Sequence, residues 1–174
     1  MVAMIFGHLP AGYLASKLLF KRLAPPFAFY PAFMCAGLLG AITPDVDLLW
    51  FYHVDGRRQH HHLYFTHWPV VWLSLLALSV WWFRRAERRE VPALAIIYSV
   101  NGCIHMCLDT IVGDIWWFAP VLDRSFSLFA VPALYKPWWL NYLFHWSMLL
   151  EIAVIAFAFW HWNSTRPRKF LQPR

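Results

Sequence analysis

Residues 92–112 read PALAIIYSVNGCIHMCLDTIV, and this stretch combines the two features that decide the fold. Its length and apolar composition are those of a helix that crosses a membrane, which needs about 20 apolar residues. His105 and Asp109 are four residues apart, so on a helix they lie on the same face. Taken alone, the pair is explained by a hydrogen bond across one helical turn. Because a buried carboxylate needs a strong partner, the pair also indicates a cation site.

The composition of the whole chain agrees with a membrane protein. Hydrophobic residues make up 60% and charged residues 14% of the 174 residues, and the mean hydropathy is +0.46. Soluble domains average roughly 45–50% apolar and about 25% charged residues. We therefore predict an all-α polytopic membrane bundle with about five transmembrane helices in a single domain, residues 1–174. The expected spans are 2–20, 28–51, 68–83, 92–112 and 138–162.

Two segments need a separate interpretation. The apolar N-terminus has no charged region before it and no small-residue cleavage site after it, so we interpret it as the first transmembrane helix and not as a signal peptide. Residues 113–137 contain Pro120, Pro132 and Pro137, which argue against one long helix. We expect this segment to be interfacial or re-entrant.

The distribution of basic residues predicts the orientation. Eleven of the 15 Lys and Arg residues lie at the ends of the first, third and fifth expected spans or just after them, and these ends are on the same side of the membrane. The positive-inside rule then places the N-terminus outside and the C-terminus in the cytoplasm. The net charge of +6 is explained by topology and lipid contact, and we expect no nucleic acid partner. The eleven residues are Lys17, Lys21, Arg22, Arg84, Arg85, Arg88, Arg89, Arg166, Arg168, Lys169 and Arg174.

With this topology, the polar residues of the spans gather at the outer end. The connection between the second and third spans contains HHHLYFTH, residues 60–67, which holds four of the nine histidines. His8, the TPDVD stretch at 43–47 and the His105–Asp109 pair lie near the same end. Polar residues within spans are costly and are usually functional. We therefore predict one metal site at this end.

The residue types narrow the choice of metal. Asp45 and Asp47 would repel each other in an almost uncharged region unless a divalent cation relieved the repulsion, although one of them could be a helix cap. Mixed nitrogen and oxygen ligands suit zinc, manganese or iron. The surplus of ligands favours two or more ions, or carboxylates that orient imidazoles. The expected metal ligands are His8, Asp45, Asp47, His62, His67, His105 and Asp109. The roles of His60, His61, His145 and Glu151 stay open.

The order of these motifs resembles that of the bacterial inner-membrane metal-dependent hydrolases of the YdjM type. The matching elements are Gly7-His8, Pro44-Asp45-Val46-Asp47, His62 to Thr66-His67, and His105, Asp109 and Gly113. The chain departs from that pattern at Leu63, Tyr64, Trp68 and Val112, which affects the substrate more than the metal. More loosely, it is similar to the zinc phospholipase C and P1-type nucleases. His145 and Glu151 are six residues apart and do not match the late HxxxE helix of those enzymes.

The resemblance implies a membrane-bound metal-dependent hydrolase. We expect a phosphoesterase that uses water activated by divalent metal, most simply Zn²⁺, to attack a lipid or lipid-linked substrate. Asp45 or Asp47 would act as general base or ligand, and Arg57, Arg58 and Arg124 would contact the substrate phosphate. Two alternatives remain open: a metal-ion transporter, and a metal-stapled structural or sensor protein.

Overall fold

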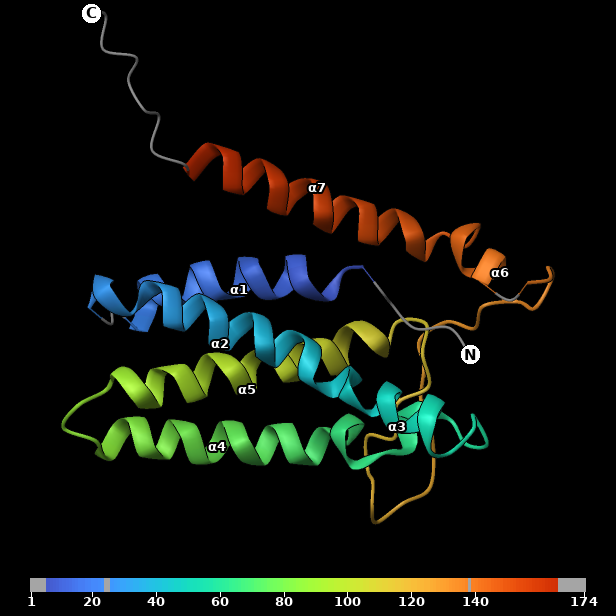
Figure 1. The fold of residues 1–174 in the computed structure, drawn as a ribbon, viewed down its shortest axis with the longest axis horizontal. Coiled ribbons are helices and arrows are strands. Elements are labelled where there is room, and N and C mark those ends of the chain that lie inside the picture. The colour runs from blue at the N-terminus through green and yellow to red at the C-terminus, as the bar shows by residue number, and fades with distance from the viewer. Residues whose placement is uncertain (1–5, 24–25, 138, 166–174) are drawn as a thin grey trace, which may run out of the picture.

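The structure is a computed structural model that describes residues 6–23, 26–137 and 139–165. Its five longer helices alternate in direction along the chain (Figure 1). Four 3-10 turns and one isolated antiparallel bridge between Ile115 and Phe126 complete the described elements, so the all-α prediction is confirmed. The helices are α1 (His8–Leu23), α2 (Tyr30–Ile42), α3 (Asp47–His53), α4 (Pro69–Arg85), α5 (Glu90–Asp109), α6 (Trp139–Leu143) and α7 (Ser147–Thr165).

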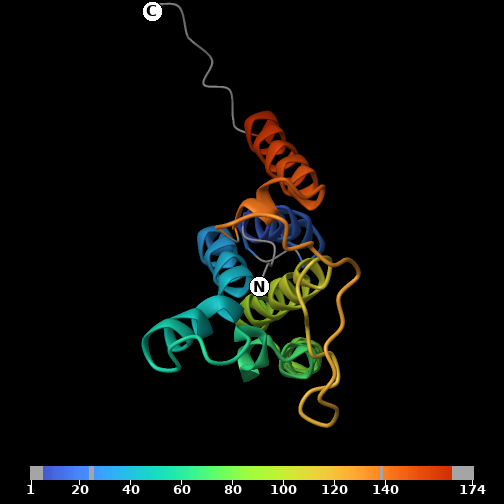
Figure 2. The same cartoon turned by 90° about the vertical axis from the view of Figure 1, so that its right-hand side faces the viewer.

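Helix α5 is the central element of the bundle. It packs against α1, α2 and α4, whereas α7 packs against α1 and forms the edge of the bundle (Figures 1 and 2). Because the helices alternate, α1 and α4 begin at the end of the bundle where α2 and α5 finish. Helix α3, residues 54–68 and residues 113–137 are gathered at this end. Segments that are distant in sequence therefore meet there.

The turn between α2 and α3 brings two aspartates to this end. Helix α2 ends at Ile42, and residues Thr43–Val46 form a 3-10 turn that includes Pro44. Proline has no N–H to donate to the preceding turn of helix, which accounts for the change of helix type. Asp45 lies in this turn and Asp47 is the first residue of α3.

Two helical segments are long and apolar enough to cross a membrane. They are Phe27–His53, which includes α2 and α3, and Glu90–Asp109. They correspond to the expected spans 28–51 and 92–112. Helices α1 and α4 contain 16 and 17 residues, fewer than the roughly 20 that a perpendicular span requires. The count of about five spans therefore stays a prediction.

The expected span 138–162 contains two helices in the structure, and its crossing of a membrane stays a prediction. The structure forms α6 over Trp139–Leu143 and starts α7 only at Ser147. Residues 144–146 separate the two helices. In this break, His145 Nδ1 lies 2.9 Å from the Ser147 hydroxyl oxygen. Residues 113–137 are irregular, as their prolines indicate. The start of the first expected span and the C-terminal cluster Arg166, Arg168, Lys169 and Arg174 lie outside the described residues.

A buried asparagine joins three helices below the polar end. The Asn101 side-chain amide on α5 donates to the Gly37 carbonyl oxygen of α2 at 2.9 Å and to the Ser16 hydroxyl of α1 at 3.1 Å. Close approach of α2 and α5 also depends on Gly40, where an added Cβ would lie 2.1 Å from the Tyr98 carbonyl oxygen. These contacts hold α1, α2 and α5 in the register that brings their ends together.

The close approach at Gly40 gives a stability prediction. Gly40→Ala would force α2 away from the α5 backbone, and overpacking of this kind costs about 1–3 kcal/mol. We expect a lower thermal unfolding temperature in detergent. Leu39→Ala, at a neighbouring position that is 50% exposed, is the control and should change it little. An unchanged unfolding temperature for Gly40→Ala would contradict the packing described here.

Candidate metal centre

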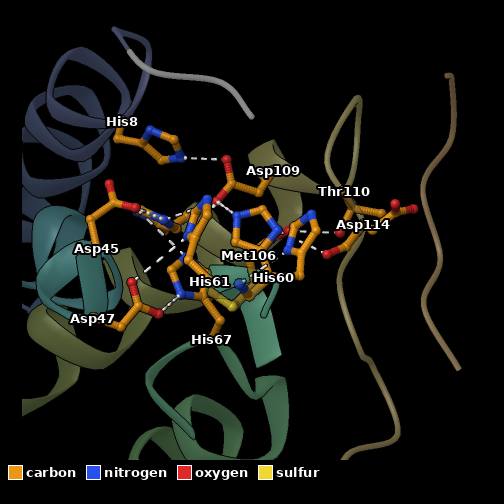
Figure 3. Close-up of polar contacts among 12 residues, drawn as sticks. His8, Asp45, Asp47, His60, His61, His67, Met106, Asp109, Thr110 and Asp114 are labelled. Atoms are coloured by element: carbon orange, nitrogen blue, oxygen red, sulfur yellow. Dashed lines mark hydrogen bonds and ion pairs between the residues drawn. The ribbon is translucent and has the colours of Figure 1, made fainter. Parts of the chain in front are cut away.

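The predicted metal-ligating residues come together at one end of the bundle (Figure 3). His8 is the first residue of α1, and His105 and Asp109 lie in the last two turns of α5. His61–Leu63 and Phe65–His67 form two 3-10 turns that lead into α4. Four separate segments therefore contribute to one cluster, which is buried apart from Asp45.

The Asp109 carboxylate is the centre of this cluster. Its Oδ2 atom lies 3.0 Å from His105 Nε2, and its Oδ1 atom lies 3.2 Å from His8 Nε2. The Nε2 atoms of His62 and His67 lie 3.6 and 3.7 Å from Oδ2. Asp109 and these four imidazoles are almost completely buried. One carboxylate thus faces four ring nitrogens without contact with solvent.

Asp45 closes the cluster from the α2–α3 turn. Its Oδ1 atom lies 3.6 Å from His105 Nε2 and 3.7 Å from His67 Nε2. Its side chain is 36% exposed, in contrast to the other residues of the cluster. The cluster is therefore open to the surroundings on the Asp45 side.

The opposite ring nitrogens determine which atoms face the centre. His105 Nδ1–H donates to the Ala41 carbonyl oxygen at 2.7 Å, and His62 Nδ1–H donates to the Asp114 carbonyl oxygen at 2.8 Å. Because a carbonyl oxygen only accepts, the neutral form of each ring carries a lone pair on Nε2. These lone pairs point at carboxylate oxygens, which are also acceptors. A cation between them satisfies both sets of atoms.

Asp47 lies on the other side of His67. It accepts hydrogen bonds from His67 Nδ1 and, at 2.9 Å, from the Thr66 hydroxyl. A carboxylate that holds the second nitrogen of an imidazole fixes the ring and directs Nε2 toward a metal. This geometry fits an orienting role for Asp47. Its Oδ1 atom lies 3.7 Å from His61 Nδ1 and has no hydrogen bond to the described residues.

Two groups of side chains have the spacing to hold a metal ion. In each group the ligand atoms lie within 4.8 Å of one another. Ligands at 2.0–2.2 Å from a tetrahedral zinc are about 3.3–3.6 Å apart, close to the 3.0–3.7 Å separations around Asp109. The groups are Asp45, His67, His105 and Asp109, and His61, His62 and His67.

Both groups include His67, which limits simultaneous occupancy. Its Nε2 atom faces Asp45 and Asp109, and its Nδ1 atom is held by Asp47. One nitrogen binds one ion, so the first group is the better candidate for the principal site. His8 stands beside this group and stacks on His105, with ring centroids 3.8 Å apart.

Charge around the cluster favours a cation. Burial acts to lower the pKa of His67, but its contacts with Asp109 and Asp47 outweigh burial and raise that pKa to about 9. By contrast, burial and the neighbouring His61 lower the pKa of His60 to about 4. The carboxylates thus attract a positive charge to the position of His67, whereas His60 stays neutral near pH 7.

The structure also places the residues whose roles were open. His61 is buried and contributes to the second group, and the consecutive histidines were the only signal for it. The buried Glu151 carboxylate accepts the Phe6 N–H at 2.7 Å, two residues before His8. In the sequence, Glu151 is an isolated acidic residue in an apolar stretch, which indicates that its carboxylate needs a polar partner. His145 contacts Ser147 within its own turn.

The predicted substrate residues lie on exposed loops. Arg57 and Arg58 follow α3, and Arg124 lies in the irregular segment after α5. The Arg57 guanidinium is 5.9 Å from the centroid of the Tyr52 ring, so it folds back over α3. A substrate role for these three residues stays a prediction.

The structure is a helical bundle with two candidate membrane spans and a buried histidine–aspartate centre that could hold a metal ion. The chain belongs to the YdjM inner membrane protein family, whose profile matches residues 3–169. The family described by the sequence motifs is therefore confirmed over nearly the whole chain. No curated protein and no solved structure matches the chain.

The contact between Asp47 and His67 predicts a specific loss of affinity. Asp47→Asn would remove the negative charge that holds His67 Nδ1, and loss of such an orienting partner typically weakens metal binding about 10–100-fold. Competition with a fluorescent zinc chelator would measure the change. Glu87→Gln removes one charge from an exposed position and is the control. Equal affinities for Asp47→Asn and the wild type would exclude the orienting role.

Proposed function

We propose that the protein is a membrane-bound metal-dependent hydrolase that acts on a phosphoester of a lipid or lipid-linked substrate. The observation that carries the proposal is the buried Asp109 carboxylate, which faces the Nε2 atoms of four histidines. The mixed nitrogen and oxygen ligands suit Zn²⁺, with Mn²⁺ and Fe²⁺ as alternatives. His67, His105, Asp45 and Asp109 would hold the principal ion, and His61 and His62 would contribute to a second.

The bound cation would supply a Lewis acid and lower the pKa of coordinated water toward neutrality. The residues of the chain then divide the remaining tasks. Asp45, on the exposed side, would bind the ion or accept the proton from the attacking water. Asp47 would keep His67 in position, and the carbonyl oxygens of Ala41 and Asp114 would do the same for His105 and His62.

The proposed substrate follows from the setting of the site. The site lies where two candidate membrane spans, Phe27–His53 and Glu90–Asp109, both end, so a substrate at the membrane surface can reach it. Arg57, Arg58 and Arg124 are the residues we propose to bind its phosphate. Under the positive-inside orientation, this end faces the periplasm.

Packing below the site favours a hydrolase over a transporter. Asn101 and Ser16 are buried just below the site and are hydrogen-bonded to each other, but farther toward the other end of the bundle the core contains Phe33, Ala93 and Ile97, which are almost fully buried and apolar. An ion pathway would require polar groups there. With Asp45 as the base, His67, His105 and Asp109 would leave one position of a tetrahedral ion open on the exposed Asp45 side, as in catalytic zinc sites, whereas structural zinc sites are closed by four protein ligands.

Phosphate release from lipid substrates tests the proposal. Wild-type protein in phosphatidylcholine nanodiscs, loaded with Zn²⁺ or Mn²⁺, should hydrolyse at least one member of a panel that includes phosphatidic acid and a polyprenyl phosphate. Asp45→Asn should lower kcat by about 10²–10⁴-fold, the range for loss of a general base. Asp123→Asn, on an exposed loop, is the control.

Two results would contradict the proposal. One is a folded, metal-loaded wild type that hydrolyses no phosphomonoester or phosphodiester. The other is an Asp45→Asn variant with the wild-type rate, which would assign the chemistry to a different residue.

A further inference from the structure

An apolar groove lies beside the candidate metal centre. It has a volume of about 520 Å³, within the range of about 300–1,000 Å³ for small-molecule sites. One wall comes from the start of α3 and the other from the 61–67 connection. Four exposed apolar side chains line it: Val46, Leu49, Trp50 and Phe65.

The groove is joined to the metal centre through its two polar lining residues. Thr66 donates to Asp47, and Asp47 accepts from His67, whose Nε2 atom faces the centre. The groove is also close to the open side of the centre along the chain. Val46 directly follows Asp45, the candidate ligand that is 36% exposed.

The surroundings of the groove indicate an amphiphilic ligand with an anionic head. Its α3 wall is the last part of the candidate membrane span Phe27–His53, so an apolar ligand reaches it from the lipid phase. Arg57 and Arg58 lie four and five residues beyond His53, the last residue of α3, and are exposed. Apolar walls, adjacent cations and a neighbouring metal centre complement an alkyl chain that carries a phosphate.

We propose that this groove binds one alkyl chain of a lipid phosphoester and presents the head of that lipid to Asp45 and the metal centre. The proposal rests on the proposed function, which it extends by locating the chain of the substrate. The competing explanation is that the groove holds ordinary bilayer lipid without selecting a head group.

Photo-crosslinking in nanodiscs separates these explanations. The probe is a diacylglycerol phosphonate, the non-hydrolysable counterpart of phosphatidic acid, with a diazirine in one acyl chain. A phosphatidylcholine with the same diazirine chain is the comparison lipid. Mass spectrometry would locate the labelled residues.

We expect the phosphonate to label residues 46–50 and 64–66 at least about fivefold more than the comparison lipid does. Leu49→Trp, at a position that is 64% exposed, fills the groove without disturbing the core and should lower this labelling at least about fivefold. Leu73→Trp is the matched control, because Leu73 is 52% exposed on α4 and does not line the groove. It should leave the labelling unchanged.

Equal labelling by the two lipids, or unchanged labelling in Leu49→Trp, would overturn the proposal. The His105→Ala/Asp109→Ala variant separates this failure from that of the proposed function. If the wild type binds no metal and yet the phosphonate labels the groove in both proteins, the lipid site stands and the hydrolase proposal falls. If the wild type binds metal and labelling is unselective, the hydrolase proposal stands without this groove.

Discussion

A fully buried carboxylate cannot remain charged without compensation, and Asp109 imposes this constraint on the whole structure. It lies at the end of the central helix, where His8, His62, His67 and His105 direct their Nε2 atoms toward it. The neutral rings of His62 and His105, whose Nδ1–H groups donate to carbonyl oxygens, present Nε2 lone pairs to the oxygens of this carboxylate, which are also acceptors. A divalent cation at the centre would attract the nitrogen and oxygen atoms alike and bind them as ligands.

The bundle is organised so that these groups can meet. Alternating helices bring the start of α1 and α4 to the ends of α2 and α5, and the Asn101 hydrogen bonds fix the register of three of them. Asp47 and two backbone carbonyl oxygens then orient individual rings. Orientation of this kind would favour the binding of a cation, because the ligands then need little rearrangement.

Sequence patterns predicted the parts of the site that depend on local geometry. The spacing of His105 and Asp109 implied a shared helix face, and apolar surroundings implied that every polar residue there has a partner. The carbonyl oxygens of Ala41 and Asp114 could not be predicted, because any residue type supplies one. The role of Asn101 and the break before Ser147 depend on tertiary contacts that periodicity does not encode. The apolar groove arises from two distant segments, and only the folded chain brings them together.

The most direct test of this account is to measure the metal content per chain by elemental analysis. The protein is purified in detergent and is never exposed to a chelator. The comparison is between the wild type and a His105→Ala/Asp109→Ala variant whose helical circular dichroism is unchanged. The account predicts at least one zinc, manganese or iron ion per wild-type chain and almost none in the variant. A well-folded wild type without bound metal would contradict it, and the histidine cluster would then need another explanation.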